Sequence, residues 1–125
     1  MVRIYGYSGC GTCRNAYRFL KERGISFSEI PIREQPPTDA ELRLAFKTMG
    51  TLSRLFNTSG QDYRGLKMKD RIRTMSIDDA IPLLRENGNL VKRPFVVANG
   101  AAWTGFDPRH WESVWPADNA PKMPL

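Results

Sequence analysis

The chain has 125 residues, of which 41% are hydrophobic and 26% are charged, and its net charge is +6. This length suits one domain with a core of its own, and this composition argues against a disordered chain. No stretch has the about 18 consecutive apolar residues that a membrane span needs, and residues 1–10 lack the long apolar region of a secretory signal. We therefore expect a cytoplasmic protein with no membrane partner. The positive charge favours an anionic ligand or partner.

The first 32 residues predict a βαβ unit. Residues 2–5 form a short run typical of a strand, and residues 6–9 form a turn. A helical pattern begins at Thr12 and ends at Gly24, and residues 25–32 then alternate between apolar and polar side chains. Such a unit favours a right-handed crossover between two parallel strands.

The middle of the chain predicts helices. Residues 38–41 have the pattern of a capping box, and the helix that they start can end at Gly50. Residues 57–60 are typical of a loop, and residues 76–79 resemble a second capping box. Pro82 is unfavourable inside the helix that would follow.

The last third predicts a hairpin and a final helix. Its signals in chain order are a strand at 94–98, a turn at Asn99–Gly100, a strand at 101–104 and a helix from Asp107–Pro108 to about Val114. The order of elements is an α/β arrangement, βαβ–ββα, with a helical insertion between the two halves. We expect one domain over residues 1–115 and a flexible tail over residues 116–125.

The chain contains two cysteines, Cys10 and Cys13. A disulfide scaffold needs more cysteines along the chain, and a structural zinc site needs about four ligands. The other candidate ligand of that kind is His110, so we expect no metal. A C-x-x-C pair between the first strand and the first helix of a βαβ pattern instead suggests a thioredoxin-like redox domain. Two incidental cysteines near a helix start are the less favoured alternative.

The start of the predicted helix favours negative charge, because unpaired N–H groups and the helix dipole meet there. A thiol in that place is expected to have a lowered pKa and to be partly thiolate. We interpret Cys10, nearer the loop, as the nucleophile and Cys13 as the resolving thiol. The same turn could bind an oxyanion through backbone N–H groups, with the candidates Gly11, Thr12, Arg14 and Asn15.

Arg93 and Pro94 precede the third predicted strand, and in a thioredoxin-like sheet this segment faces the cysteine loop. The Arg93–Pro94 bond is a candidate cis peptide. Arg93 is a candidate cation beside the thiols, and Pro94 is a further candidate for substrate or anion binding. The basic stretch Lys67, Lys69, Arg71 and Arg73 is better explained as a solvated face than as a nucleic-acid site, since no aromatic residues are interleaved with it. The late aromatic residues are better explained by helix packing than by a ligand cage.

Four motifs together resemble the arsenate-reductase ArsC/Spx family, in the order and spacing of that family: CGTCRN (10–15), PPT (36–38), FNTSGQDYR (56–64) and KRPFVV (92–97). The resemblance covers residues 2 to about 115. It implies a thioredoxin-like fold with a helical insertion, a redox-active Cys10, and Arg93 with cis-Pro94 beside it.

The chain also departs from the glutaredoxin-dependent arsenate reductases that it resembles. Those proteins have serine at the position of Cys13, histidine at Gly6, and arginines at Asn57 and Gly105. The C-x-x-C form is shared with the Spx/MgsR branch.

Three functions follow from this resemblance. We expect first a thiol–disulfide redox protein of ArsC type, with glutathione or glutaredoxin as a candidate reductant or a protein disulfide as substrate, and no bound cofactor. The alternative is an Spx/MgsR-like redox-sensing regulator that binds the RNA polymerase α subunit. A true arsenate reductase comes third. We expect a monomer with no direct nucleic-acid ligand.

Overall fold

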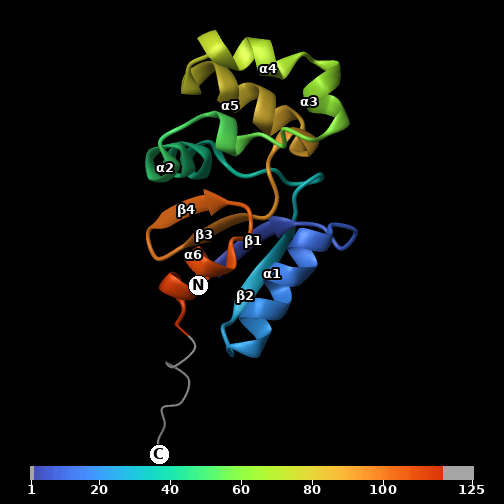
Figure 1. Cartoon of the computed structure of the whole chain (residues 1–125). Helices are drawn as coiled ribbons and strands as arrows, with labels where there is room; N and C mark the ends of the chain where they lie inside the picture. Colours follow the sequence, from blue (N-terminus) through green and yellow to red (C-terminus); the bar gives the residue numbers. More distant parts are fainter. Residues whose placement is uncertain (1, 117–125) are drawn as a thin grey trace, which may run out of the picture.

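The computed structural model describes residues 2–116, which include a four-stranded sheet in the order β2-β1-β3-β4 (Figure 1). Strands β1 (Val2–Gly6) and β2 (Phe27–Pro31) are parallel. Strand β3 (Phe95–Ala98) runs antiparallel to β1 and to β4 (Ala101–Thr104). The predicted βαβ unit and hairpin are therefore confirmed, and they join through β1 and β3.

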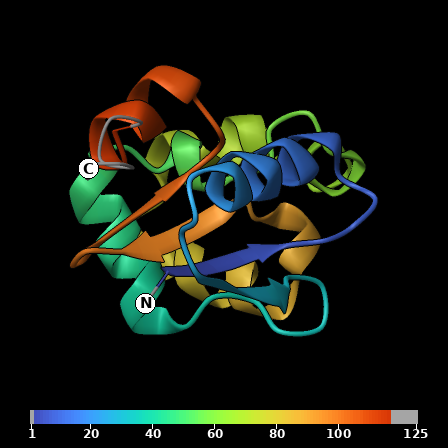
Figure 2. The same cartoon turned by 90° about the horizontal axis from the view of Figure 1, so that it is seen from below.

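Helices α1 (Gly11–Glu22) and α6 (Pro108–Val114) cover one face of the sheet (Figures 1 and 2). Val2 and Ile4, which alternate along β1, contribute to the core on this face. Aromatic rings dominate the contact with the final helix, as the sequence predicts: Phe19, Trp103, Phe106, Trp111 and Trp115 pack edge to face or tilted. His110 is exposed on α6, with its ring against Trp103.

The helical insertion between β2 and β3 covers the other face (Figure 1). Tyr5 of β1, Phe95 of β3 and Ala102 of β4 belong to the core on this side. The elements of the insertion are α2 (Asp39–Met49), η1 (Ser53–Leu55), α3 (Gln61–Gly65), α4 (Met68–Arg71), η2 (Ile72–Thr74), α5 (Ile77–Glu86) and η3 (Gly88–Leu90). The sheet thus separates two cores, one on each face.

Both predicted capping boxes form. The Thr38 hydroxyl accepts the Glu41 N–H while the Glu41 carboxylate accepts the Thr38 N–H, and Ser76 and Asp79 repeat the arrangement at α5. Gly50 ends α2 with a φ of 80°, a conformation that glycine adopts readily. Helix α5 continues through Pro82, although proline cannot donate the usual backbone bond there.

The short helices α3 and α4 have no counterpart among the predicted elements, because each is only about one turn long and carries no capping signal. The basic residues of this segment are exposed, in agreement with a solvated face: Arg64, Lys67, Lys69, Arg71 and Arg73. Within the described part of the chain, each helix is too short or too polar to span a bilayer. Nearly all of the predicted tail, from residue 117 onward, lies outside the described residues.

Candidate active site

Cys10 occupies the N-cap position of α1. Its N–H donates to the Tyr7 carbonyl at 3.1 Å, and its Sγ accepts the Cys13 N–H at 3.2 Å. The sulfur therefore stands where a serine or aspartate oxygen usually caps a helix. The first turn of α1 has no acidic residue, so negative charge on this half-buried sulfur meets N–H groups and the positive end of the helix dipole.

Cys13 has no exposed surface and belongs to the core between α1 and the sheet. Burial, followed by the hydrogen bond with Cys10, raises the pKa of the Cys13 thiol from 9.0 to about 12. The Tyr7 backbone and the charge of Arg93 act in the opposite direction and are weaker. For Cys13 the predicted lowering of the pKa is therefore wrong, because desolvation of the thiolate outweighs the helix start.

Gly6 allows the close packing behind the cysteine pair. A Cβ atom at this position would lie 2.7 Å from Oη of Tyr17 and 2.8 Å from Sγ of Cys13. The Tyr17 ring stacks on Phe27, with 5.7 Å between ring centres. Burial, and then the nearby Cys13 charge, raises the pKa of Tyr17. A histidine at position 6 would displace these two side chains.

Two arginines lie over the ring of Tyr7, which follows β1. The Cζ atoms of Arg33 and Arg93 are 4.0 Å and 4.7 Å from the ring centre, distances typical of cation–π contacts. Arg33 Nε donates to Asn89 Oδ1 at 2.9 Å. Arg93 Nη1 is buried and has no hydrogen-bond partner among residues 2–116. The site thus has two cations and unused donor capacity.

Sequence reasoning missed Arg33. Gly6 pairs with Pro31 at the ends of the parallel strands β1 and β2, so the next residues of both strands leave the sheet at the same edge. This juxtaposition brings Arg33 to Tyr7. The βαβ prediction already contained that signal, but the exact register was needed to use it.

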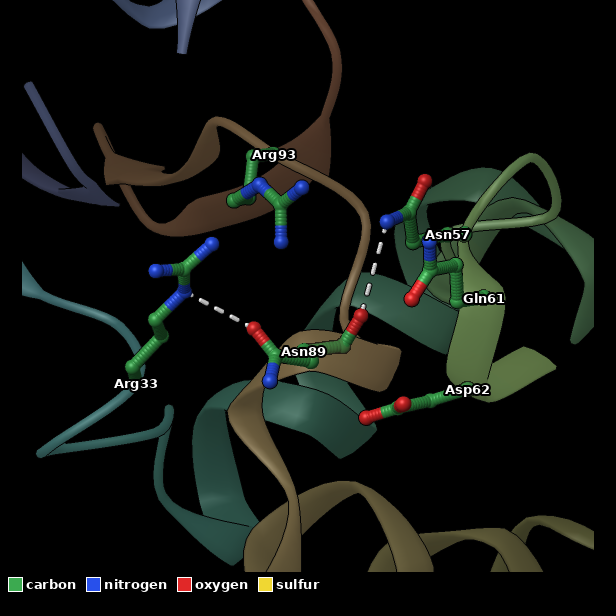
Figure 3. A pocket seen from close by; sticks show the side chains of 7 residues that line it. Arg33, Asn57, Gln61, Asp62, Asn89 and Arg93 are labelled. Carbon is green, nitrogen blue, oxygen red and sulfur yellow. Dashed lines mark hydrogen bonds between the residues drawn. The ribbon is translucent and has the colours of Figure 1, made fainter. Parts of the chain in front are cut away.

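Both arginines line a cavity of about 210 Å³ (Figure 3). Asp62 lies on the wall away from Arg93, and amide side chains lie between the charges (Figure 3). The complete lining is Arg33, Asn57, Gly60, Gln61, Asp62, Asn89 and Arg93. The cysteines do not line it, and Tyr7 connects the two places through its ring and its carbonyl.

Residues 5–114 match the model of the ArsC family. The chain belongs to the ArsC family. The Bacillus subtilis protein YusI, described as uncharacterized, is 40% identical over 91% of this chain and 98% of its own length. The regulatory protein MgsR of B. subtilis is 30% identical over 86% of this chain and 84% of its own length. The crystal structure of a possible arsenate reductase from Streptococcus mutans matches with a TM-score of 0.79 and 37% identity, over 85% of this chain and 91% of that one.

ArsC membership and the sheet order agree on the thioredoxin-like fold with a helical insertion. The Arg93–Pro94 peptide bond is cis, as predicted, and Pro94 is buried. The predicted oxyanion-binding residues lie in the first turns of α1 and are exposed: Gly11, Thr12, Arg14 and Asn15. Arg14 donates to the Ser8 carbonyl at 2.7 Å and so braces the turn before Cys10. Of the predicted site residues, only Arg93 lines the cavity.

Proposed function

We propose that this ArsC-family chain is a thiol–disulfide oxidoreductase in which Cys10 attacks and Cys13 resolves. The observation that carries the proposal is the pairing of a half-buried N-cap sulfur with a fully buried thiol one helical turn later. A substrate disulfide can approach the first sulfur, whereas only an intramolecular attack is open to the second.

The reaction balances without a bound cofactor. The Cys10 thiolate attacks one sulfur of a substrate disulfide, forms a mixed disulfide and expels the other half as a thiolate. The Cys13 thiolate then attacks Cys10 Sγ, forms the Cys10–Cys13 disulfide and expels the second half. Two electrons pass to the substrate, and the two thiol protons go to the expelled thiolates. An external thiol, of the glutathione or glutaredoxin class, returns the pair to the dithiol.

The surrounding groups have supporting roles in this proposal. Arg93 offsets negative charge at the cysteine pair, since its charge acts on Cys13. The N–H group of Cys13 holds the attacking sulfur. The first turn of α1, from Gly11 to Asn15, would accept an anionic part of the substrate through its backbone.

A single-turnover experiment tests the proposal. Reduced protein is mixed with excess 2-hydroxyethyl disulfide, and released thiol and protein mass are measured. We expect the wild type to release two thiols per chain and to end as an internal disulfide. Cys13→Ser should release one thiol and retain the mixed disulfide at Cys10. Cys10→Ser should release no thiol on the time scale of the wild-type reaction. Equal release by Cys10→Ser and the wild type would contradict the proposal.

A redox-sensing regulator is the second candidate, and the similarity to MgsR favours it. The exposed basic residues around α3 and α4 also flank Leu66, a large hydrophobic side chain that is 42% exposed. Such a surface suits an acidic protein partner, for which the RNA polymerase α subunit is the candidate. Capture of purified α subunit by the oxidised but not the reduced chain, without disulfide turnover, would favour this function.

Arsenate reduction is the third candidate. Arg33 adds a second cation beside Arg93, but Asn57 and Gly105 leave two expected arginine positions without charge. Arsenate-dependent consumption of glutathione, without turnover of 2-hydroxyethyl disulfide, would favour it over the other two.

A further inference from the structure

The cavity beside Tyr7 has walls of opposite charge. Arg33 and Arg93 supply guanidinium groups on one side, and Asp62 supplies a carboxylate across from Arg93 (Figure 3). Three amide side chains, which both donate and accept hydrogen bonds, complete the polar lining: Asn57, Gln61 and Asn89. This arrangement suits a group that carries both charges better than it suits a doubly charged oxyanion, which Asp62 would repel.

The charged groups of the walls are held in place but keep free capacity. Arg33 uses Nε for Asn89, and Asp62 Oδ2 accepts from Asn87 Nδ2 at 2.9 Å. Asn57 Nδ2 donates to the backbone carbonyl of Asn89 at 3.4 Å, which holds the Asn57 side chain in the wall (Figure 3). The buried Nη1 of Arg93 has no partner among the described residues. An unpaired buried donor is unfavourable, so the described residues leave Arg93 incompletely satisfied.

We propose that this cavity binds an α-amino-acid head group, with its ammonium and carboxylate, of a short peptide-like thiol or its disulfide. The carboxylate would pair with Arg33 and Arg93, and the ammonium with Asp62. The volume of about 210 Å³ fits a head group, because pockets for whole drug-sized ligands have roughly 300–1,000 Å³. The proposal deepens the proposed function by naming the substrate class, and it rests on that function.

Tyr7 explains how such a ligand would meet the thiol. Its ring contacts both arginines, and its carbonyl accepts the N–H of Cys10. The ligand therefore runs along Tyr7, with the head group in the cavity and the sulfur toward Cys10. Because Cys10 does not line the cavity, the ligand has to extend beyond its head group to meet the thiol, and each extended residue adds about 3.3–3.6 Å of reach. A dipeptide or tripeptide thiol belongs to the expected class.

Binding of S-methylglutathione tests the site without thiol chemistry, because this thioether cannot form a disulfide. We expect saturable binding by calorimetry to the reduced full chain. Arg33→Gln and Asp62→Asn should each weaken it by about tenfold, the effect of about 1.4 kcal/mol. The matched controls Arg109→Gln and Glu22→Gln change exposed charges on α6 and α1 and should leave Kd unchanged. No binding, or equal binding by all four variants, would overturn the proposal.

Kinetics with four disulfides separates this proposal from the proposed function. Glutathione disulfide carries both charges, dithiodipropionate only carboxylates, cystamine only ammonium groups, and 2-hydroxyethyl disulfide none. We expect the lowest KM for glutathione disulfide, and Arg33→Gln should raise that KM with little change in kcat.

Turnover of all four disulfides with the same KM would overturn the head-group proposal and leave the proposed oxidoreductase function intact. Binding of S-methylglutathione without turnover of any disulfide would support the head-group site and overturn the proposed oxidoreductase function. Displacement of the probe by millimolar inorganic phosphate would indicate a simple anion site and overturn the head-group proposal.

Discussion

Cys10 and Cys13 have the same side chain but opposite environments. The Cys10 sulfur is half-buried at the N-cap of α1, while Cys13 is fully enclosed between Gly6, Tyr17 and the helix. The largest cause of the raised Cys13 pKa is burial, which persists when Cys10 is in a mixed disulfide. In the proposed reaction we therefore expect closure of the internal disulfide to be limited by the small thiolate fraction of Cys13.

The rate of this closure should depend steeply on pH. Only the thiolate attacks, and burial keeps the pKa of Cys13 above its ordinary value, so the rate should rise by up to about tenfold per pH unit from pH 7 to 9. The measurement is loss of a preformed mixed disulfide with glutathione, followed by mass spectrometry at each pH. Cys13→Ser, in which closure cannot occur, is the control. A plateau near neutral pH would contradict the expectation.

At the scale of elements, Glu41 connects the first turn of α2 to strand β1. Its Oε1 accepts the Tyr5 hydroxyl at 2.6 Å and the Thr38 N–H at 2.9 Å, and Arg3 forms an ion pair with Oε2. Glu41 is only 8% exposed, so its charge is largely removed from water. These bonds compensate for that cost and hold the insertion against the sheet.

Glu41→Gln should lower the free energy of unfolding by about 1–3 kcal/mol, because the amide can accept fewer bonds and cannot pair with Arg3. Urea denaturation followed by circular dichroism provides the measurement. Glu86→Gln, an exposed change at the end of α5, is the matched control and should stay within about 0.5 kcal/mol of the wild type. The same loss in both variants would show that Glu41 has no special role.

Elements with local signals could be predicted from the sequence. The capping boxes at Thr38 and Ser76, the Asn99–Gly100 turn and the Asp107–Pro108 helix start all form where the residue pattern indicates. Helices α3 and α4 could not, since each is about one helical turn and depends on contacts such as burial of Met68 in the insertion core.

The candidate site was predictable only in part for the same reason. The C-x-x-C position and the Arg93–Pro94 pair are local motifs, and both were found. The contribution of Arg33 depends on the register of β1 and β2, and the raised pKa of Cys13 depends on Tyr17 and Gly6 closing around it. The first effect arises from residues that are distant in sequence and the second from the packing of α1 against the sheet, so no local pattern reports them.

At the scale of the whole molecule, the buried thiol couples stability to alkaline pH. The pKa of Cys13 rises from 9.0 to about 12 on folding. Below pH 9 the thiol is neutral in the folded and the unfolded state, and the free energy of unfolding is not reduced. Between pH 9 and 12 only the unfolded thiol ionises, and stability falls as pH rises, by up to about 1.4 kcal/mol per pH unit.

This loss should be visible under reducing conditions. The free energy of unfolding, measured by urea denaturation at several values from pH 8 to 10.5, should fall more steeply for the wild type than for Cys13→Ala. The variant has its own packing defect, so the slope with pH is compared and not the absolute stability. Parallel slopes would contradict the assignment of the effect to Cys13.

The division into two cores has an optical consequence. Of the three tryptophans in the chain, Trp103 and Trp111 are buried in the core beneath α1 and α6, and Trp115 packs against them. Ultraviolet emission excited near 295 nm therefore reports on one layer of the molecule. The cavity residues Asn57 and Asp62 belong to the insertion on the other side of the sheet, so a ligand bound there would leave that emission almost unchanged. Binding of a ligand in the cavity must therefore be followed with a spectroscopic probe placed in the insertion or by calorimetry.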